Sequence, residues 1–255
     1  MFGYLSLLSR IRLGPKEVDV GALARRQYML PITGFVIGSI VSIVALLIFE
    51  IPGDTTGIML ESLGIILFLY LLTGLIHLEG LADFGDGLMA SGTQERKRQA
   101  MKDVSLGAAG VFFLVAALLS LFILVTHLDG WVGSPALTLL FDRIPLVWGL
   151  ILAEMSAKLA MMTVMSIGPS SHQGMGSAFV SAASPGKLLA GIMMAVLIAF
   201  ALCGIYCIIV LLGLVAGIIV AVEARRHFGG VGGDSFGAAN EFGRILALLA
   251  WVVLL

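Results

Sequence analysis

Long apolar stretches alternate with short polar segments along this chain. A membrane span needs about 20 predominantly apolar residues, and the pattern predicts spans at about 30–49, 57–76, 106–127 and 135–166, with a last one ending at residue 255. A further uncharged run, 188–222, exceeds what one helix needs to cross a core of about 30 Å. We therefore divide it near Gly204. The pattern predicts about seven transmembrane helices, within a range of six to eight.

Composition supports the same fold class. Of the 255 residues, 59% are hydrophobic and 12% are charged, whereas a soluble domain carries about 25% charged residues. The chain is therefore expected to be an all-α, polytopic integral membrane helical bundle. We interpret 1–255 as a single membrane-embedded domain that begins with an interfacial, cytoplasmic segment at 1–27.

The distribution of positive charge predicts the orientation. Lys and Arg concentrate in four segments, namely 1–27, 77–104, 167–187 and 223–244. Positively charged segments favour the cytoplasmic side of a membrane. We expect a multi-pass protein of the cell membrane with its N-terminus in the cytoplasm, and with 77–104 and 223–244 as cytoplasmic active-site loops. The net charge of −1 indicates no particular partner, and we expect no nucleic acid.

The first candidate site is a stripe of carboxylates in the sequence H-L-E-G-L-A-D-F-G-D-G. Glu79, Asp83 and Asp86 follow one another at i, i+4 and i+7, which places them on one side of a helix. Three neighbouring carboxylates repel one another, and a divalent cation offsets this cost. Mg²⁺ is commonly held by one or two carboxylates together with substrate phosphates. We favour a Mg²⁺ site; a solvated helix end without an ion is the alternative.

A second candidate site is the glycine-rich segment 229–244, G-G-V-G-G-D-S-F-G-A-A-N-E-F-G-R. Glycines let a backbone approach a ligand closely, and a glycine turn that opens a helix can present N–H groups to phosphate. Asp234 and Glu241 are seven residues apart and would share a face of a helix that begins near Ser235. A flexible membrane loop is the alternative. The candidate substrate contacts here are Gly229, Gly230, Gly233 and Asn240.

Other polar residues carry weaker signals. Glu154 and Lys158 lie four apart inside a predicted span, where charged residues usually face the bundle interior. Two interpretations stay equally open: the two residues neutralise each other, or they contact the substrate. Lys102 and Asp103 are either interfacial anchors or site residues, and His77 is either a hydrogen-bonded interfacial residue or a substrate contact.

Three blocks of sequence together resemble a known family. The first block is the carboxylate stripe, the second is M-K-D-V-S-L-G-A-A-G at 101–110, and the third is the glycine-rich segment. In this order they resemble the signature blocks of the cobalamin synthase family, the adenosylcobinamide-GDP ribazoletransferases, over essentially the whole chain. The chain departs from the family pattern at Glu79, usually Asp, at Gly232, usually Thr, and at Val104-Ser105, commonly Ser-Arg. Glutamate still offers oxygen ligands, whereas the missing arginine removes a phosphate contact.

The resemblance implies a reaction and roles for the candidate residues. α-Ribazole, or its 5′-phosphate, would attack the cobinamide-side phosphorus of adenosylcobinamide-GDP, and GMP would leave. By this hypothesis Glu79, Asp83 and Asp86 hold Mg²⁺, and Asp103 is a further ligand or orients the hydroxyl. Asp234 and Glu241 would hold a second ion or the ribazole hydroxyl. The expected catalytic set is Asp83, Asp86, Asp103 and Asp234, and the expected substrate contacts also include His77, Lys102, Glu154 and Lys158.

Two other functions stay open at this point. D-F-G-D-G-L-M-A is similar to the opening of the CDP-alcohol phosphotransferase motif, although Ser91 stands where that motif has arginine. A membrane CDP-alcohol phosphatidyltransferase-like enzyme is therefore one alternative. A cation-coupled transporter built around Glu154 and Lys158 is the other. Release of a nucleotide would distinguish the enzymes from the transporter, which moves a solute without releasing GMP or CMP. A homo-oligomer and contacts with other cobalamin-assembly enzymes also stay open.

Overall fold

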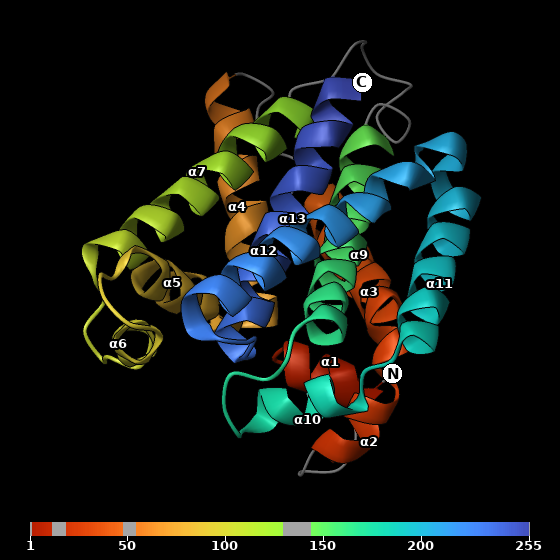
Figure 1. Ribbon diagram of the computed structural model, residues 1–255. Helices are drawn as coiled ribbons and strands as arrows, with labels where there is room; N and C mark the ends of the chain where they lie inside the picture. Colours follow the sequence, from red (N-terminus) through yellow and green to blue (C-terminus); the bar gives the residue numbers. More distant parts are fainter. Residues whose placement is uncertain (1, 12–18, 48–54, 130–143, 255) are drawn as a thin grey trace, which may run out of the picture.

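The protein is described by a computed structural model that covers residues 2–11, 19–47, 55–129 and 144–254. Within these ranges the chain is almost entirely helical (Figure 1), which confirms the all-α class. The elements follow in the order α1 (Phe2–Leu8), α2 (Val20–Arg25), η1 (Gln27–Met29), α3 (Leu30–Leu47), α4 (Thr55–Thr73), α5 (Ile76–Met89), α6 (Gln94–Ala100), α7 (Ala108–Asp129), α9 (Ile144–Ile167), α10 (Met175–Ala182), α11 (Pro185–Cys203), η2 (Gly204–Leu211), α12 (Leu212–Phe228) and α13 (Gly233–Leu254).

Helix α9 is the centre of the bundle. Every residue from 149 to 165 is buried, because α3, α12 and α13 pack around this helix. Glycines on the neighbouring helices allow these backbones to approach closely. A Cβ added at Gly34 of α3 would meet the carbonyl oxygen of Glu154, and one added at Gly213 of α12 would meet that of Ser156. The functional groups of α9 are therefore held by helix packing on several sides.

The predicted spans match the observed helices. Six helical segments in the described ranges are long and apolar enough to cross a membrane, and one of them, 185–228, contains both α11 and α12. This run is divided as predicted: α11 ends at Cys203, and Gly204 has a φ of +58°, which favours glycine. Parts of three expected segments, 12–18, 48–49 and 135–143, lie outside the described residues.

Two expected loops are corrected. Residues 223–244 are not one loop, because α12 continues to Phe228 and α13 already begins at Gly233. The connection is thus a short glycine turn between two helices. Similarly, 77–104 consists mostly of α5 and α6, and the polar segment 167–187 contains α10.

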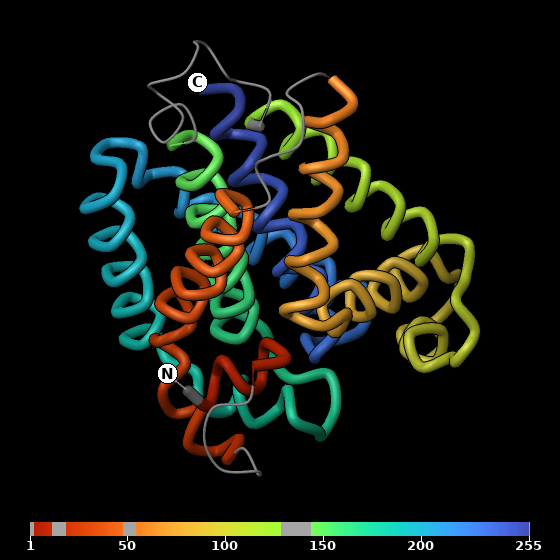
Figure 2. The backbone as a smooth tube through the Cα atoms, turned by 180° about the vertical axis from the view of Figure 1, so that it is seen from behind, coloured from red at the N-terminus to blue at the C-terminus, as the bar shows by residue number. Residues whose placement is uncertain are grey.

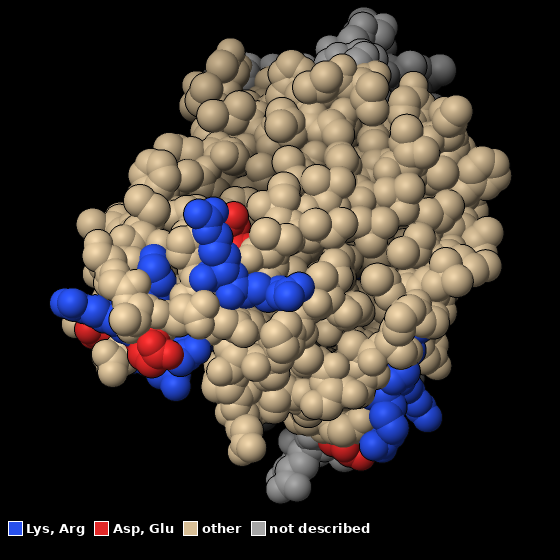
Figure 3. Space-filling model, viewed as in Figure 1, with Lys and Arg blue, Asp and Glu red and all other residues tan. Residues whose placement is uncertain are grey.

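The polar elements gather at one end of the bundle. Seen from both sides, α1, α2 and α10 lie at the end opposite the C-terminus (Figures 1 and 2). Charged side chains on the face drawn in Figure 3 also lie toward this end, whereas the opposite end of that face carries none. Exposed Arg25, Arg96, Arg225 and Arg226 contribute to this distribution. On this face, the described charged residues thus lie from the middle of the bundle toward the end that carries α1, α2 and α10, which we call the charged end.

Candidate active site

Helix α5 carries the acidic stripe and crosses α13 at close range. The crossing depends on two glycines: a Cβ added at Gly80 would lie 3.2 Å from the Cα of Asp234, and one added at Gly237 would lie 2.9 Å from the carbonyl oxygen of His77. Any larger side chain at these positions would separate the helices. The glycines therefore bring Asp234, at the start of α13, close to the stripe on α5.

Asp86, the third member of the stripe, points to a different partner. One of its carboxylate oxygens accepts a hydrogen bond from the backbone N–H of Gly107 and the other from that of Gly110, both at 2.8 Å. Gly107 directly precedes α7 and Gly110 lies in its first turn, where N–H groups lack helical partners and favour a negative charge. Asp86 thus caps α7 and fastens it to α5.

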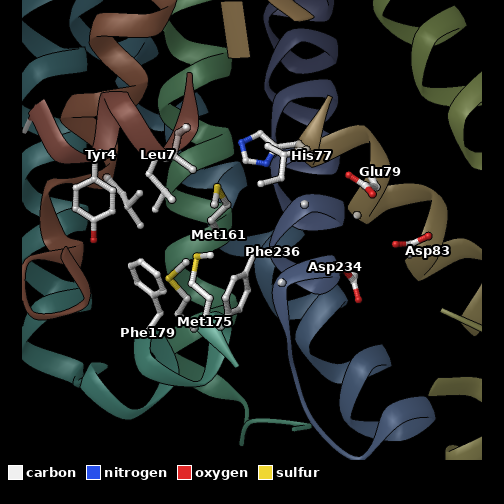
Figure 4. A pocket seen from close by; sticks show the side chains of 18 residues that line it. Tyr4, Leu7, His77, Glu79, Asp83, Met161, Met175, Phe179, Asp234 and Phe236 are labelled. Atoms are coloured by element: carbon white, nitrogen blue, oxygen red, sulfur yellow. The ribbon is translucent and has the colours of Figure 1, made fainter. Parts of the chain in front are cut away.

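A cavity of about 350 Å³ opens between α5, α13 and the N-terminal part of the chain. Its acidic side carries Glu79 and Asp83 from α5 and Asp234 from α13 (Figure 4). The opposite side is apolar and comes from α1, α3, α9, α10 and α13. The apolar lining includes Tyr4, Leu7, Leu8, Leu30, Met161, Met165, Met175, Phe179 and Phe236. The cavity therefore combines a negatively charged side with an aromatic and sulfur-containing side.

The carboxylates of the acidic side lack ion-pair partners among the residues that the structure describes: none of Glu79, Asp83 and Asp234 takes part in an ion pair there. Burial, followed by the negative charges of Asp234, Glu79 and Asp86 in that order of effect, raises the pKa of Asp83 to about 6. A carboxylate that titrates near neutral pH can both bind a cation and accept a proton.

His77 lies between the two sides of the cavity (Figure 4). The side chain is 4% exposed, and its Nε2 has no hydrogen-bond partner among the described residues. Burial and the positive charges of Lys158 and Arg244 hold the pKa of His77 well below its usual range. At neutral pH the imidazole is therefore uncharged, and Nε2 is an enclosed polar atom whose hydrogen-bonding capacity is unused among the described residues.

The glycine turn forms a second, smaller hollow on the other side of Asp234. Residues 169–171 pair with Val231 through two backbone hydrogen bonds, from Val231 N to Pro169 O at 2.8 Å and from Ser171 N to Val231 O at 2.9 Å. Gly229 ends α12 with a φ of +76°. The hollow is lined by Arg98, Met101, Lys102, Ser171, His172, Phe228, Gly230, Gly232, Asp234 and Ser235. Asp234 thus separates an acidic cavity from a hollow that contains several cationic and polar groups.

The remaining predicted residues divide between these places. Gly233 lines the cavity, and Gly230 and Lys102 line the hollow. Asp103 lines neither the cavity nor the hollow. It is exposed, and its Oδ1 accepts a hydrogen bond from the backbone N–H of Ser105. Gly229 serves as the left-handed end of α12 rather than as a lining residue.

A separate cluster of charges lies deeper in the bundle. Six buried residues from α4, α9 and α13 form it, namely Tyr70, Glu154, Lys158, Asn240, Glu241 and Arg244. Arg244 donates hydrogen bonds to both carboxylates, from Nε to Glu154 at 2.5 Å and from Nη1 to Glu241. Lys158 donates to Oδ1 of Asn240 at 2.5 Å and lies 3.5 Å from Oε2 of Glu154. The two carboxylates and two cations balance each other.

This cluster corrects one expectation and separates three others from the cavity. Both carboxylate oxygens of Glu241 are engaged, since Oε2 accepts from Tyr70 at 2.8 Å and from Arg244, and Oε1 accepts from Asn240 at 3.1 Å. The side chain is completely buried, so the expected metal role does not fit this position. Glu154, Lys158 and Asn240 also do not line the cavity, and the neutralising pair is the alternative that the geometry favours for Glu154 and Lys158.

Residue patterns in the sequence did not reveal the apolar side of the cavity. Tyr4 lies in the first helix, and Met161 and Met165 are four residues apart in α9, which is a spacing common to any buried helix face. Phe179 belongs to the short helix α10, within the polar segment 167–187. The i, i+4 methionines were a visible signal, but no pattern indicated that they face a cavity.

The cavity suits a metal ion that arrives with a ligand better than one held by protein alone. Across the described ranges, no three His, Cys, Asp or Glu side chains are close enough to form a complete metal site. The acidic side nevertheless offers oxygen ligands that have no ion-pair partner in the described ranges. Mg²⁺ keeps several waters and shares its coordination with substrate phosphates, so the residues present fit this ion.

The fold and the site together define a polytopic membrane enzyme with an acidic cavity at one end of its helical bundle. The chain belongs to the cobalamin-5-phosphate synthase family, whose model matches residues 1–252. It is therefore a transferase of cobalamin biosynthesis, and the phosphatidyltransferase and transporter alternatives are not favoured.

Individual relatives agree over nearly the whole chain. A protein of Methanococcoides burtonii described as adenosylcobinamide-GDP ribazoletransferase is 34% identical over 99% of this chain and 90% of its own length. Proteins of the same description from Methanocella arvoryzae and Halorubrum lacusprofundi are 37% and 34% identical, over 96% and 98% of this chain and 91% and 95% of their own lengths. No solved structure matches this chain at a significant level.

Proposed function

We propose that this protein joins α-ribazole, or its 5′-phosphate, to adenosylcobinamide-GDP and releases GMP. A ribose hydroxyl oxygen bonds to the phosphorus that carries the cobinamide. The bond from that phosphorus to the bridging oxygen of the diphosphate breaks, and GMP departs with the electron pair. The hydroxyl proton passes to a carboxylate. The observation that carries this proposal is the cavity lined by Glu79, Asp83 and Asp234, three carboxylates that have no ion-pair partner among the described residues.

The residues of the cavity have distinct roles in this reaction. Asp83 accepts the proton in this proposal, because it lines the cavity together with Glu79 and Asp234 and a carboxylate can serve as a general base. Mg²⁺, held by one or two of the carboxylates of Glu79, Asp83 and Asp234 together with diphosphate oxygens, would neutralise the charge that develops on the departing phosphate. Asp86 stays at the start of α7, where it positions α5 rather than touching the substrate.

The hollow beside the glycine turn has a volume of about 20 Å³, which admits single phosphate oxygens of the donor diphosphate rather than the whole group. It contains Arg98 and Lys102 together with the polar groups of Ser171 and His172, and cations stabilise a diphosphate. It shares Asp234 with the cavity. A donor in the hollow and an acceptor in the cavity would meet at this residue.

The decisive experiment measures GMP release from adenosylcobinamide-GDP and α-ribazole by the purified protein in lipid nanodiscs, with and without Mg²⁺. We expect Mg²⁺-dependent GMP in equal amount to a cobalamin product. Asp83→Asn and Asp234→Asn should each lower turnover by at least ~100-fold, since they remove the proton acceptor and the shared carboxylate. Glu223→Gln alters a carboxylate of α12 that lines neither the cavity nor the hollow, and this variant should leave turnover unchanged. Near-normal turnover by Asp83→Asn would exclude its role.

The membrane and the orientation are part of the same proposal. The exposed arginines at the charged end of the bundle support a cytoplasmic position for the N-terminus and the cavity in the cell membrane. Glu95→Cys introduces a thiol at an exposed position of α6, whereas Cys203 and Cys207 are both buried. A membrane-impermeant maleimide should label this thiol in inside-out vesicles and not in intact cells. Labelling of intact cells would reverse the orientation.

A further inference from the structure

The two sides of the cavity require a ligand with two unlike halves. The apolar side is built from Tyr4, Met161, Met165, Phe179 and Phe236, all of them at least half buried, together with neighbouring leucines (Figure 4). Methionine sulfur and aromatic rings favour contact with flat aromatic groups. The acidic side, across the cavity, offers carboxylates to hydroxyl groups or a cation. An aromatic group linked to a polar, hydroxylated group fits this arrangement.

The apolar side has few free polar atoms. The hydroxyl of Tyr4 donates a hydrogen bond to the carbonyl oxygen of Leu23 at 2.7 Å and is thereby engaged. Nε2 of His77, at the border of the two sides, is buried and has no partner among the described residues. A buried polar atom without a partner costs folding free energy unless a ligand or water satisfies it. The cavity thus suits an aromatic ligand with one hydrogen-bonding atom.

We propose that the apolar side binds the benzimidazole base of α-ribazole, with His77 facing the unsubstituted nitrogen of that base. This proposal rests on the proposed function and assigns one substrate to one part of the site. The ribose then lies toward Asp83 and Asp234, where its hydroxyl is needed. The volume of about 350 Å³ is in the range of small-molecule pockets and suits a nucleoside. A corrin ring with its side chains is several times larger and remains outside.

The apolar lining of the cavity should also determine which base the protein accepts. A purine base carries additional ring nitrogens and exocyclic groups that would lose water against Met161, Met165 and Phe179. An apolar pocket disfavours such added polar groups by roughly 10- to 100-fold. The protein should therefore prefer α-ribazole over the matching adenine α-riboside by about this factor in kcat/KM.

The first test introduces an amide into the apolar side and measures KM for each substrate in nanodiscs. Met165→Gln should raise KM for α-ribazole by about tenfold and narrow the preference over the adenine α-riboside, while KM for adenosylcobinamide-GDP changes less than twofold. Met175→Gln should act in the same direction; this residue lines the cavity but is 57% exposed, so the change cannot prevent folding. Met89→Gln, at an exposed position outside the cavity, is the matched control. A rise in KM for the corrinoid instead of α-ribazole would overturn the proposal.

The second test concerns the partner of the base nitrogen. His77→Leu removes every hydrogen-bonding atom of this side chain, whereas His77→Gln keeps a donor. We expect His77→Leu to raise KM for α-ribazole by about tenfold and His77→Gln to restore most of the loss, with little change in KM for the corrinoid. Equal loss in both variants would exclude the assigned hydrogen bond.

Direct binding distinguishes this inference from the reaction itself. Equilibrium dialysis of α-ribazole against the protein in nanodiscs needs neither donor nor turnover. Binding that is weakened by Met165→Gln would support the base site even if no GMP were released, in which case the proposed reaction alone would fail. Turnover with unaltered α-ribazole binding in Met165→Gln would support the reaction and overturn the base site. If α-ribazole does not bind at all, the assignment is wrong and a lipid chain becomes the occupant to examine.

Discussion

The acidic side of the cavity should make the folded protein less stable than it would be without one of its charges. The pKa of Asp83 is raised from 3.8 to about 6, first by burial and then by Asp234, Glu79 and Asp86. A shift of two units corresponds to about 3 kcal/mol. Because the side chain is partly exposed, solvent screening reduces this figure to about 1 kcal/mol. Asp83→Asn should therefore raise the free energy of unfolding by about 1 kcal/mol while it abolishes turnover.

The effect should depend on pH in a defined direction. The folded-state pKa lies above the unfolded one, so the folded protein binds more protons between about pH 4 and pH 6. The stability contributed by neutral Asp83 is therefore present below about pH 4 and is lost as the pH rises through about 6. The gain from Asp83→Asn should be largest at pH 7.5 and should shrink as the pH falls to 5. Tryptophan fluorescence during thermal unfolding in detergent, at a fixed heating rate, gives the midpoint of unfolding. The gain in stability appears as a higher midpoint.

Asp86→Asn is the matched control because the same change on the same helix should have the opposite sign. Its carboxylate accepts the N–H groups of Gly107 and Gly110, and an amide can accept with only one of its two ends. Loss of such a cap costs about 1 kcal/mol. If both variants shift the midpoint in the same direction, or if Asp83→Asn destabilises the protein, the electrostatic reasoning is refuted.

Further predictions concern the buried cluster, the helix crossing and the metal. Arg244→Met should lower the free energy of unfolding by about 3–5 kcal/mol, because Glu154 and Glu241 lose their shared cation; urea unfolding in detergent measures this. Gly237→Ala should lower it by about 1–3 kcal/mol and reduce turnover, because its Cβ would press on the carbonyl oxygen of His77 and separate α5 from α13. Mg²⁺ at 100 times its dissociation constant should stabilise the wild type by about 2.7 kcal/mol and Asp83→Asn by less; removal by EDTA reverses the effect.

Local patterns in the sequence were sufficient for most of the fold. Hydropathy located the long helices, and Gly204 marked the division of the longest apolar run, because both signals lie within a short window. The stripe of carboxylates on α5 was visible for the same reason. Hydropathy could not show that polar segments are helical, because their helices, such as α10, are held by contacts with distant elements.

The site was predicted only in part, because its partners lie far apart in the sequence. Asp86 was grouped with Glu79 and Asp83, but its two backbone partners are 21 and 24 residues further along the chain. Asp234 and Glu241 share a helix face, yet seven residues raise Glu241 by about 10 Å along α13. That distance places it in the apolar interior beside Tyr70 instead of at the cavity. Periodicity in the sequence shows on which face of a helix a residue lies, but it does not show how deep in the bundle that residue lies.

The arrangement of the buried charges also bears on how the bundle is assembled. Glu154 and Lys158 are both on α9, and Glu241 and Arg244 are both on α13, so each helix carries its own neutral pair when it enters the lipid. The contact between Arg244 and Glu154 joins the two helices afterwards. A slip of one turn between them would leave that pair unmatched in an apolar setting. The two pairs within single helices thus favour insertion of each helix into the membrane. The contact between Arg244 and Glu154 then favours the one register in which α9 and α13 pack with all four charges matched.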